Sequence, residues 1–578
     1  MNRLIDAIES RLSAEDKERL QAIYAPTVVA TPLADARRHV CVLRDGEIRS
    51  YGEVGGSHVT HRKGAYEYLA STDAGLSWKQ HKARGLMHAC TYIPAWDTYV
   101  GTADGQFNTW GDKQGLWVTL SDVGPDDPHP TIIQLSDEQY GDTFQPRKSR
   151  YGDRLWFTSQ VMVEGEFTVN FFYSDDRGHT WEHRRFPRPA IGDLGPRWCH
   201  RSGTEPYAME VSEGHMLMLV RTPDDCFYQM ESFDGGDSWT APVPSTFYGR
   251  NTTPYMLRLA DGRLITFWNN TRPMPVPDLS DYPYPMPGGV EDGTGESGFT
   301  NRDAAHAAIS EDGGKTFIGY REILLNPIRN RADFRYYGGT DDTVDKSVHQ
   351  FQAFELPYGK VLVCVGQNVA ARRLVIFDVN WLYDTARRED FFTGLEGLTT
   401  HAFLKGYVGS TAWTDAKNGH CAFNRTHGAL LTPDPTGGFR EHLYIRKSDD
   451  PALLTGVGGA AWNFPLSKSG RVTVELILTE QQAHLSLTDR WCVPCDPSVQ
   501  GSALFPIILD ADTIGTDPVT VTLDYDTAVG TCAVAVDGKP IDPVPMARPC
   551  PTGVCYLILQ CATEGPSRGF YVRRLEKV

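Results

Sequence analysis

Apolar and polar residues alternate along most of this chain, in short runs separated by turns that contain glycine or aspartate. Residues 205–221, 253–269 and 350–366 each hold an alternating run, a turn and a second apolar run. A period of two residues is typical of β-strands, and two such runs joined by a tight turn are typical of a β-hairpin. Weaker copies begin near Thr27, His88 and Phe144. The pattern therefore predicts six repeated β units.

The two ends of the chain differ from these repeats. In the first 23 residues, Leu4, Ile8 and Leu12 have the spacing of one helix face, with charged residues between them. This spacing predicts a short N-terminal helix over residues 1–23. The segment lacks the apolar core and the cleavage site of a signal peptide, so we do not expect it to be one. Beyond residue 395, alternating runs such as 471–478 and 519–525 predict a β-sandwich that extends to residue 578.

A motif of eight residues occurs four times, with the pattern Ser-x-Asp-x-Gly-x-Ser/Thr followed by Trp or Phe. Its copies are residues 71–78, 174–181, 232–239 and 310–317. The Asp carboxylate can accept hydrogen bonds from the backbone of its own turn, and the Gly can adopt a positive φ. We expect the closing aromatic residue to pack the hairpin onto the sheet beneath it.

This motif resembles the Asp-box of the sialidase-like superfamily, and the resemblance covers about residues 24–390. Members of that family are β-propellers in which the boxes lie on outer strands, away from the active site. The resemblance implies an all-β fold, with a six-bladed β-propeller at residues 24–395 that carries the active site. The sandwich at residues 396–578 is similar to the lectin-like or jelly-roll modules of such proteins. The implied activity is that of an exo-acting glycosidase that releases a terminal acidic sugar.

Composition narrows the range of partners. The net charge of −17 argues against a nucleic-acid partner, which requires a basic surface, whereas an anionic sugar needs only a local cluster of arginines. No run approaches the about 18 apolar residues of a membrane span, so we expect no membrane contact. Scattered cysteines in apolar surroundings favour buried thiols and a cytoplasmic protein. The pattern leaves the oligomeric state undetermined.

One cysteine group allows two interpretations. Cys492 and Cys495 are separated by two residues, and Cys550 and Cys555 follow later in the chain. Four such thiols are a possible zinc site, but the irregular spacing of the second pair favours plain thiols in two loops of a β domain. We therefore expect no metal and no cofactor.

Aligning the repeats places candidate residues at the mouth of the predicted channel. His88, Phe144, Glu205, Thr253 and Gln350 share one inner position, and His349 directly precedes the last of them. First strands line the channel of a propeller, and ligands gather where several strands aim side chains at one point. Glu205 follows a loop that contains His200 and Arg201, so it is expected to stay ionised and to act as a base or activator.

The resemblance implies further roles. The family grips the substrate carboxylate with three arginines, for which Arg201, Arg221 and Arg302 are the candidates here, with Arg37 and Arg62 as weaker options. His200 and Gln350 complete the predicted substrate-binding set.

The family's nucleophile is a Tyr polarised by a Glu, with an Asp as acid/base. The last inner strand, residues 346–351, has no Tyr, which leaves Tyr337 as the substitute and Asp341 or Asp342 as the acid. This departure predicts a sialidase-like glycosidase rather than strict sialidase activity.

Two other functions fit the same residues. His88 and His349 suit a polysaccharide lyase, because neutral His can remove the proton beside a uronate carboxylate near pH 7. A propeller that binds glycans without catalysis is the third possibility. A proline-rich insertion between Asn270 and Arg302 is expected to cover the channel or to form a pocket wall.

Overall fold

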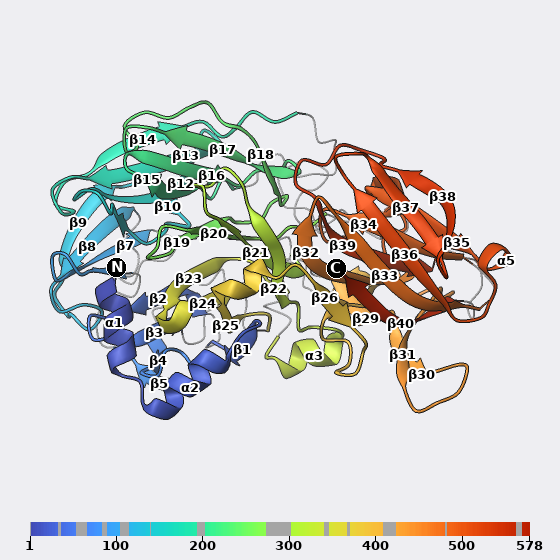
Figure 1. Ribbon diagram of the computed structural model, residues 1–578. Helices are drawn as coiled ribbons and strands as arrows, with labels where there is room; N and C mark the ends of the chain where they lie inside the picture. The colour runs from blue at the N-terminus through green and yellow to red at the C-terminus, as the bar shows by residue number, and fades with distance from the viewer. Residues whose placement is uncertain are drawn as a thin grey trace.

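The protein is described here by a computed structural model (Figure 1). The described residues are 2–32, 36–53, 66–83, 90–104, 115–138, 140–192, 203–272, 302–339, 346–366, 370–407, 423–479, 482–561 and 569–578. Most elements are strands, and all pairs within the sheets are antiparallel, so the chain is nearly all-β. In the described part, no helix has the length and apolar character needed to cross a membrane.

The N-terminal segment forms two helices, α1 (Asn2–Ser10) and α2 (Ala14–Ala22), instead of the single helix predicted. The second helix restarts because the Ser13 hydroxyl accepts from the Asp16 backbone while the Asp16 carboxylate accepts in return, a capping box. Ile8, Leu12 and Leu20 are buried, as the spacing predicted.

Six small sheets follow one another along the chain. The first two are β2 (Ala36–Val42), β3 (Ile48–Glu53), β4 (Tyr66–Ser71) and β5 (Lys79–Lys82), then β6 (Cys90–Ile93), β7 (Thr98–Asp104), β8 (Leu116–Ser121) and β9 (Thr131–Ser136). The third is β10 (Tyr140–Gly141), β11 (Arg147–Lys148), β12 (Leu155–Val163), β13 (Glu166–Ser174) and β14 (Glu182–Phe186). The fourth is β15 (Tyr207–Ser212), β16 (His215–Val220), β17 (Cys226–Ser232) and β18 (Val243–Tyr248).

The fifth sheet is β19 (Tyr255–Arg258), β20 (Leu264–Trp268), β21 (Ala304–Ser310) and β22 (Ile318–Leu325), after which α3 (Arg331–Tyr336) leads to the sixth. The sixth is β23 (Phe351–Leu356), β24 (Lys360–Val365), β25 (Arg373–Asp378) and, at its edge, β1 (Thr27–Ala30). The copy predicted near Thr27 is therefore the outer strand of the last sheet, and the first sheet begins at Ala36. Because Thr27 pairs with Ile376, the two ends of this region are joined in one sheet.

The inner strands of neighbouring sheets lie against one another, the third sheet through β12. β2 contacts β6, β12 contacts β15, β15 contacts β19, β19 contacts β23, and β23 contacts β2. Gln352 of the sixth sheet accepts from the Val40 backbone at 2.7 Å and donates to its carbonyl at 2.8 Å. Gln145, before β11, donates to the Cys90 carbonyl at 3.3 Å and accepts from Gln352. Side chains at the inner edges thus join four of the sheets.

Arg147, on β11, links the inner edges of the third, fourth and fifth sheets. Its Nη2 donates to the Tyr207 hydroxyl at 2.9 Å and also to the Tyr255 hydroxyl. The third, fourth and fifth sheets are therefore joined through one guanidinium.

The structure confirms the turn chemistry predicted for the eight-residue motif, which lies between the third and fourth strands of four sheets. In the first copy, Ser77 N–H donates to Asp73 Oδ1 at 2.9 Å, Gly75 has φ 89°, and the Trp78 indole donates to the Gly75 carbonyl at 2.8 Å. Hydrogen bonds from the Ser238 side chain and backbone lower the pKa of the equivalent Asp234 to about 2. The copies at 174–181 and 310–317 have the same bonds around Asp176 and Asp312.

The C-terminal part contains two larger sheets, coloured orange to red in Figure 1. One is β30 (Leu430–Pro433), β31 (Glu441–Arg446), β40 (Gly569–Lys577), β33 (Ser469–Leu478), β36 (Val519–Asp526), β37 (Thr531–Val536) and β38 (Lys539–Pro545), with β26 (Arg387–Glu389) beside β40. The other is β27 (Leu398–Thr399), β32 (Gly458–Ser467), β39 (Val554–Cys561), β34 (Gln482–Thr488) and β35 (Phe505–Asp510), followed by α5 (Ala511–Ile514). A separate hairpin is β28 (His401–Tyr407) with β29 (Phe423–His427).

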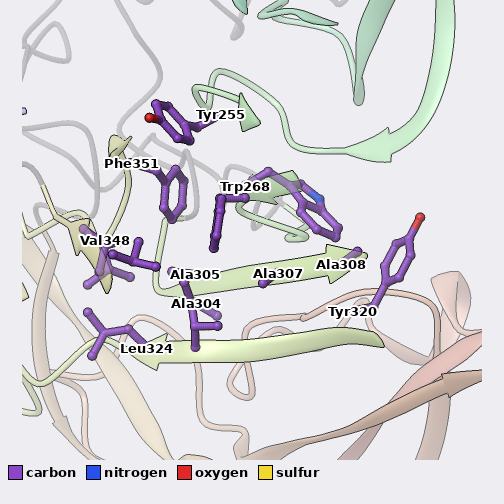
Figure 2. Packing of buried hydrophobic residues seen from close by; sticks show 14 of the residues in the cluster. Tyr255, Trp268, Ala304, Ala305, Ala307, Ala308, Tyr320, Leu324, Val348 and Phe351 are labelled. Carbon is purple, nitrogen blue, oxygen red and sulfur yellow. The ribbon is translucent and has the colours of Figure 1, made fainter. Parts of the chain in front are cut away.

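One buried cluster continues from the small sheets into the C-terminal part and includes Trp268, Phe351, Trp491 and Tyr556. Figure 2 shows the alanines of β21 between Trp268 and Phe351 on one side and Leu324 of β22 on the other. These small side chains allow close packing of neighbouring layers. The two parts therefore share one core.

Candidate functional site

Glu205 lies two residues before β15 and is 4% exposed. Arg221 Nη1 donates to Glu205 Oε1 at 2.8 Å, and the Thr253 hydroxyl donates to Oε2. The pairing follows from strand register, because Tyr207 opposite Leu219 places Glu205 opposite Arg221. A buried carboxylate held by a guanidinium stays ionised, so Glu205 is an anion in the folded protein.

The neighbouring sheet fixes the backbone of this carboxylate. Gln160 Oε1, on β12, accepts from the Thr204 N–H at 2.7 Å and from the Glu205 N–H at 3.2 Å. Gln160 Nε2 donates in turn to Asp142 Oδ2 at 2.8 Å. Neither Gln160 nor Asp142 was a sequence candidate, because nothing in their local pattern marks a contact across two sheets.

Arg302 lies two residues before β21 and is 1% exposed. Its Nη2 donates to the carbonyl of Asn251, which is two residues before Thr253. The Arg302 carbonyl accepts from the Val348 N–H at 2.8 Å, directly before His349. Arg302 thus lies between the starts of β19 and β23, at the same end of the sheets as Glu205.

His349 and Gln350 precede β23. The His349 carbonyl accepts from the Gly366 N–H at 2.9 Å, and the Thr204 carbonyl accepts from the Arg221 N–H in the same way, also at 2.9 Å. His349 therefore corresponds to Thr204, and Gln350 to Glu205, in agreement with the sequence alignment. Gln350 has φ 66°, a left-handed conformation that is uncommon for a residue with a side chain.

Tyr337 follows α3, is half-buried and packs beside Arg373, whose Cζ lies 4.5 Å from the ring centroid. In the described part of the chain, no hydrogen bond joins Tyr337 to Glu205. Glu205 and Tyr337 both lie at the end of the sheets where the first strands begin. Tyr337 lies there because it packs beside Arg373, and β25 starts at Arg373 next to the end of β24. The structure brings Glu205, Arg221 and Thr253 into direct contact and places Arg302, His349, Gln350 and Tyr337 around the same end.

Several sequence candidates lie outside the described residues. They are His88, His200, Arg201, Asp341, Asp342 and Arg62, together with most of the insertion after Asn270.

Two arginines of this region were missed by the sequence reasoning. Arg372 and Arg373 are 3% and 4% exposed, and Arg372 Nε donates to the Gly366 carbonyl at 2.7 Å. The available signal was the pair of arginines directly before the apolar run of β25, which resembles the place of Arg221 directly after β16.

The C-terminal part contributes a buried ionic group beside Arg302. Arg425 Nη2 lies 2.5 Å from Asp303 Oδ1, and Asn326 Nδ2 donates to the same oxygen at 2.8 Å. His401 Nε2 lies 3.7 Å from Asp303 Oδ2, and burial holds the pKa of His401 well below its usual value. This neutral His and the ion pair anchor the segment that carries Arg302.

Within the described ranges, no group of three or more His, Cys, Asp or Glu side chains is arranged to hold a metal ion. Cys492, Cys495 and Cys555 are buried free thiols, and Cys550 is a half-buried one. Burial raises the pKa of Cys492 and of Cys495 to about 12, so both are neutral thiols.

Comparison with known proteins gives one family and several relatives. Residues 105–336 match the model of the BNR repeat-like domain. A segment of 92 residues is 28% identical to the anhydrosialidase of Macrobdella decora, and it covers 16% of this chain and 11% of that protein.

Solved sialidase structures are also similar to this chain. Trypanosoma rangeli sialidase in complex with sialic acid has 11% identity over 96% of this chain and 94% of that one, with a TM-score of 0.36. The NanB sialidase of Streptococcus pneumoniae has 12% identity over 64% and 73% of the respective chains, with a TM-score of 0.38.

Proposed function

We propose that the chain is a member of the sialidase-like superfamily and an exo-acting glycosidase that releases a terminal acidic sugar from an oligosaccharide or polysaccharide, which the match of residues 105–336 to the BNR repeat-like domain supports. The observation that supports this most is the buried Glu205–Arg221 pair at the end of the sheets where Arg302, Arg372 and Arg373 gather. In a chain of net charge −17, such a local excess of guanidinium groups suits an anionic ligand.

We propose that the six small sheets are the blades of a propeller at residues 24–395, followed by a sandwich at 396–578. The contacts of β6 with β2, β2 with β23, β23 with β19, β19 with β15 and β15 with β12 support a ring of blades, which the hydrogen bond from Gln145 to the Cys90 carbonyl of β6 completes. The pairing of β1 with β25 supports its closure. The pairing of β26 with β40 means that the chain contacts the C-terminal sheets already at Arg387.

In this proposal Glu205 is an activator. Arg221 keeps it ionised, and Thr253 orients it, so it can polarise a hydroxyl group that approaches from the mouth. We propose Tyr337 as the nucleophile and Asp341 as the acid, with His88 and His349 as further catalytic groups. Arg201, Arg302, His200 and Gln350 would bind the sugar.

The test is release of the terminal sugar from fluorogenic sialosides and uronosides. E205Q keeps the shape of Glu205 but removes its charge, so we expect kcat to fall by about 100-fold to 10,000-fold. E213Q, an exposed change in the turn of the same hairpin, is the matched control and is expected to keep full activity. Full activity of E205Q, or no release from any acidic glycoside, would contradict the proposal.

A lyase acting on uronate-containing glycans is the second candidate, favoured by His349 before β23, directly after Val348, whose N–H donates to the Arg302 carbonyl. An unsaturated product that absorbs ultraviolet light identifies this reaction. Binding of the glycan without any product identifies a non-catalytic propeller.

We also propose a cytoplasmic location. The cysteines of the described segments are all free thiols, which suits a reducing compartment.

A further inference from the structure

Cys41 and Cys90 lie on the neighbouring inner strands of the first two sheets, β2 and β6. Both side chains are 1% exposed, and both belong to one buried cluster that also contains Tyr51 and Tyr99. The Cys41 side chain forms a hydrogen bond with the Cys90 thiol. Two thiols from different sheets are therefore in direct contact, although they are distant in the chain.

The alternation of side chains along each strand directs the two thiols toward each other. On β2, Val40 and Val42 pack in a cluster shared with the sixth sheet, whereas Cys41 packs in a cluster shared with the second. On β6, Ile93 packs toward the third sheet and Cys90 toward the first. Successive side chains of a strand point to opposite faces, so the direction of each thiol follows from its place in the strand.

Side chains from outside these two sheets hold their backbones together where the thiols meet. Gln145 Nε2 donates to the Val40 carbonyl at 3.4 Å and to the Cys90 carbonyl at 3.3 Å. Val40 directly precedes Cys41, and Gln352 of the sixth sheet binds both its N–H and its carbonyl. The two strands are thus held at a fixed separation beside the thiols.

This arrangement suits a covalent bond between the two sulfur atoms. Two cysteines can be bridged without movement of the backbone when their strands adjoin and their side chains face each other. The hydrogen bond with Cys41, together with burial, raises the pKa of the Cys90 thiol well above its usual value. Because the thiolate is the reactive form, Cys90 reacts slowly and stays reduced in the absence of an oxidant.

We propose that Cys41 and Cys90 are a peroxide-responsive pair that forms a disulfide between the first and second sheets. One thiol attacks a peroxide oxygen, which gives a sulfenic acid and one water. The second thiol then attacks the sulfenic sulfur, and the S–S bond forms as a second water leaves. Two thiols and one hydrogen peroxide thus give one disulfide and two waters, with the thiols oxidised and the peroxide reduced.

Hydrogen peroxide is a suitable oxidant for this pair because it is close to water in size, and both side chains are 1% exposed. The bond would add a covalent link between two sheets of the ring. In a reducing compartment the pair stays as two thiols until peroxide accumulates. None of these steps depends on the proposed glycosidase function.

The test treats the folded full chain with hydrogen peroxide, caps the remaining thiols with N-ethylmaleimide and maps the digested peptides by mass. We expect a linked pair of peptides that contains Cys41 and Cys90, and we expect dithiothreitol to separate them. C41S and C90S should each lack the link. C226S removes a half-buried thiol of the fourth sheet and is the matched control, which should form the link as the wild type does.

The wild type alone can overturn the proposal, whether or not the variants fold. A wild type without the link after peroxide treatment would do so. Links spread equally over other cysteines would also do so, because they would show that Cys41 and Cys90 have no preference for each other.

Thermal unfolding tests whether the bond constrains the two sheets. A disulfide restricts the unfolded chain, so the Tm of the peroxide-treated wild type should exceed that of the dithiothreitol-treated protein by about 2–8 °C. C41S cannot form the link and should show no such difference, and C41A replaces it if C41S does not fold. A linked wild type with an unchanged Tm would overturn the stabilising role of the bond.

Discussion

Glu205 and Arg221 are each nearly enclosed, and each is the other's charge partner. Neither residue is unusual in isolation, since many strands end in charged residues. Their effect comes from the distance of 2.8 Å between Nη1 and Oε1 in a buried position, where an ion pair interacts far more strongly than at the surface.

Arg221→Met should be strongly destabilising. It leaves the Glu205 carboxylate buried without its guanidinium, and breaking a buried pair from one side costs about 3–5 kcal/mol. The free energy of unfolding from a denaturant titration measures this loss. Arg388→Met, which removes an exposed pair with Asp390, is the matched control and should change stability by less than about 1 kcal/mol. Similar small losses in both variants would show that the pair contributes little.

At the scale of the element, the eight-residue turns determine how each sheet ends. The glycine at the fifth position of each motif has a positive φ, and its lack of a side chain also lets the next sheet approach. In the third copy, a Cβ on Gly236 would overlap the Phe171 ring of the neighbouring sheet. The turn is therefore both a chain reversal and a contact between sheets.

Gly236→Ala tests this double role against Gly313→Ala. Gly313 has φ 72° and open space where a Cβ would lie, so its substitution carries only backbone strain of about 1–2 kcal/mol. Gly236 has φ 103° and the Phe171 overlap, so overpacking should add about 1–3 kcal/mol more. Denaturant unfolding measures both variants. Equal losses would mean that Phe171 moves aside freely.

At the scale of the whole molecule, a chain of hydrogen bonds joins the small sheets to the C-terminal part. The Asn270 N–H donates to His306 Nδ1 at 3.1 Å, which leaves the proton of the neutral ring on Nε2. Nε2 then donates to the Tyr556 hydroxyl at 2.5 Å, and that hydroxyl donates to Glu322 Oε1 at 2.6 Å. Each donor has one acceptor, so the direction of the whole chain is determined.

Glu322 should make the stability of the molecule depend on pH. Burial raises the pKa of Glu322 to about 7, against opposing effects of Tyr556, Arg387, Arg321 and Arg329. An unfolded Glu has a pKa of about 4.3, so between these values the folded state binds a proton that the unfolded state does not. Stability from this group is therefore present below about pH 4.3 and is lost as the pH rises towards 7.

Glu322→Gln removes that titration and keeps a carbonyl oxygen for Tyr556. Its stability should vary less than that of the wild type between about pH 4.3 and 7, measured by thermal unfolding at fixed ionic strength. Glu311→Gln, in the turn that joins the same two strands and exposed, is the control and should keep the wild-type profile. Identical profiles for all three proteins would exclude Glu322 as the group responsible.

Local patterns in the sequence predicted the repeated hairpins, the hydrogen bonds of the eight-residue turns and the buried face of the N-terminal helices. These features depend on residues within a few positions of one another, and a period of two or a Gly in a turn is visible in the chain itself. Aligning the repeats also predicted that Glu205, Thr253 and His349 occur at strand starts.

Tertiary structure alone decided what those residues contact. The pairing of Arg221 with Glu205 depends on the register of β15 and β16. The support from Gln160 depends on the packing of a neighbouring sheet. The strand at Thr27 depends on pairing with a segment about 350 residues later. Such properties arise from segments distant in the chain, whose approach is set by packing of whole sheets, so no local pattern encodes them.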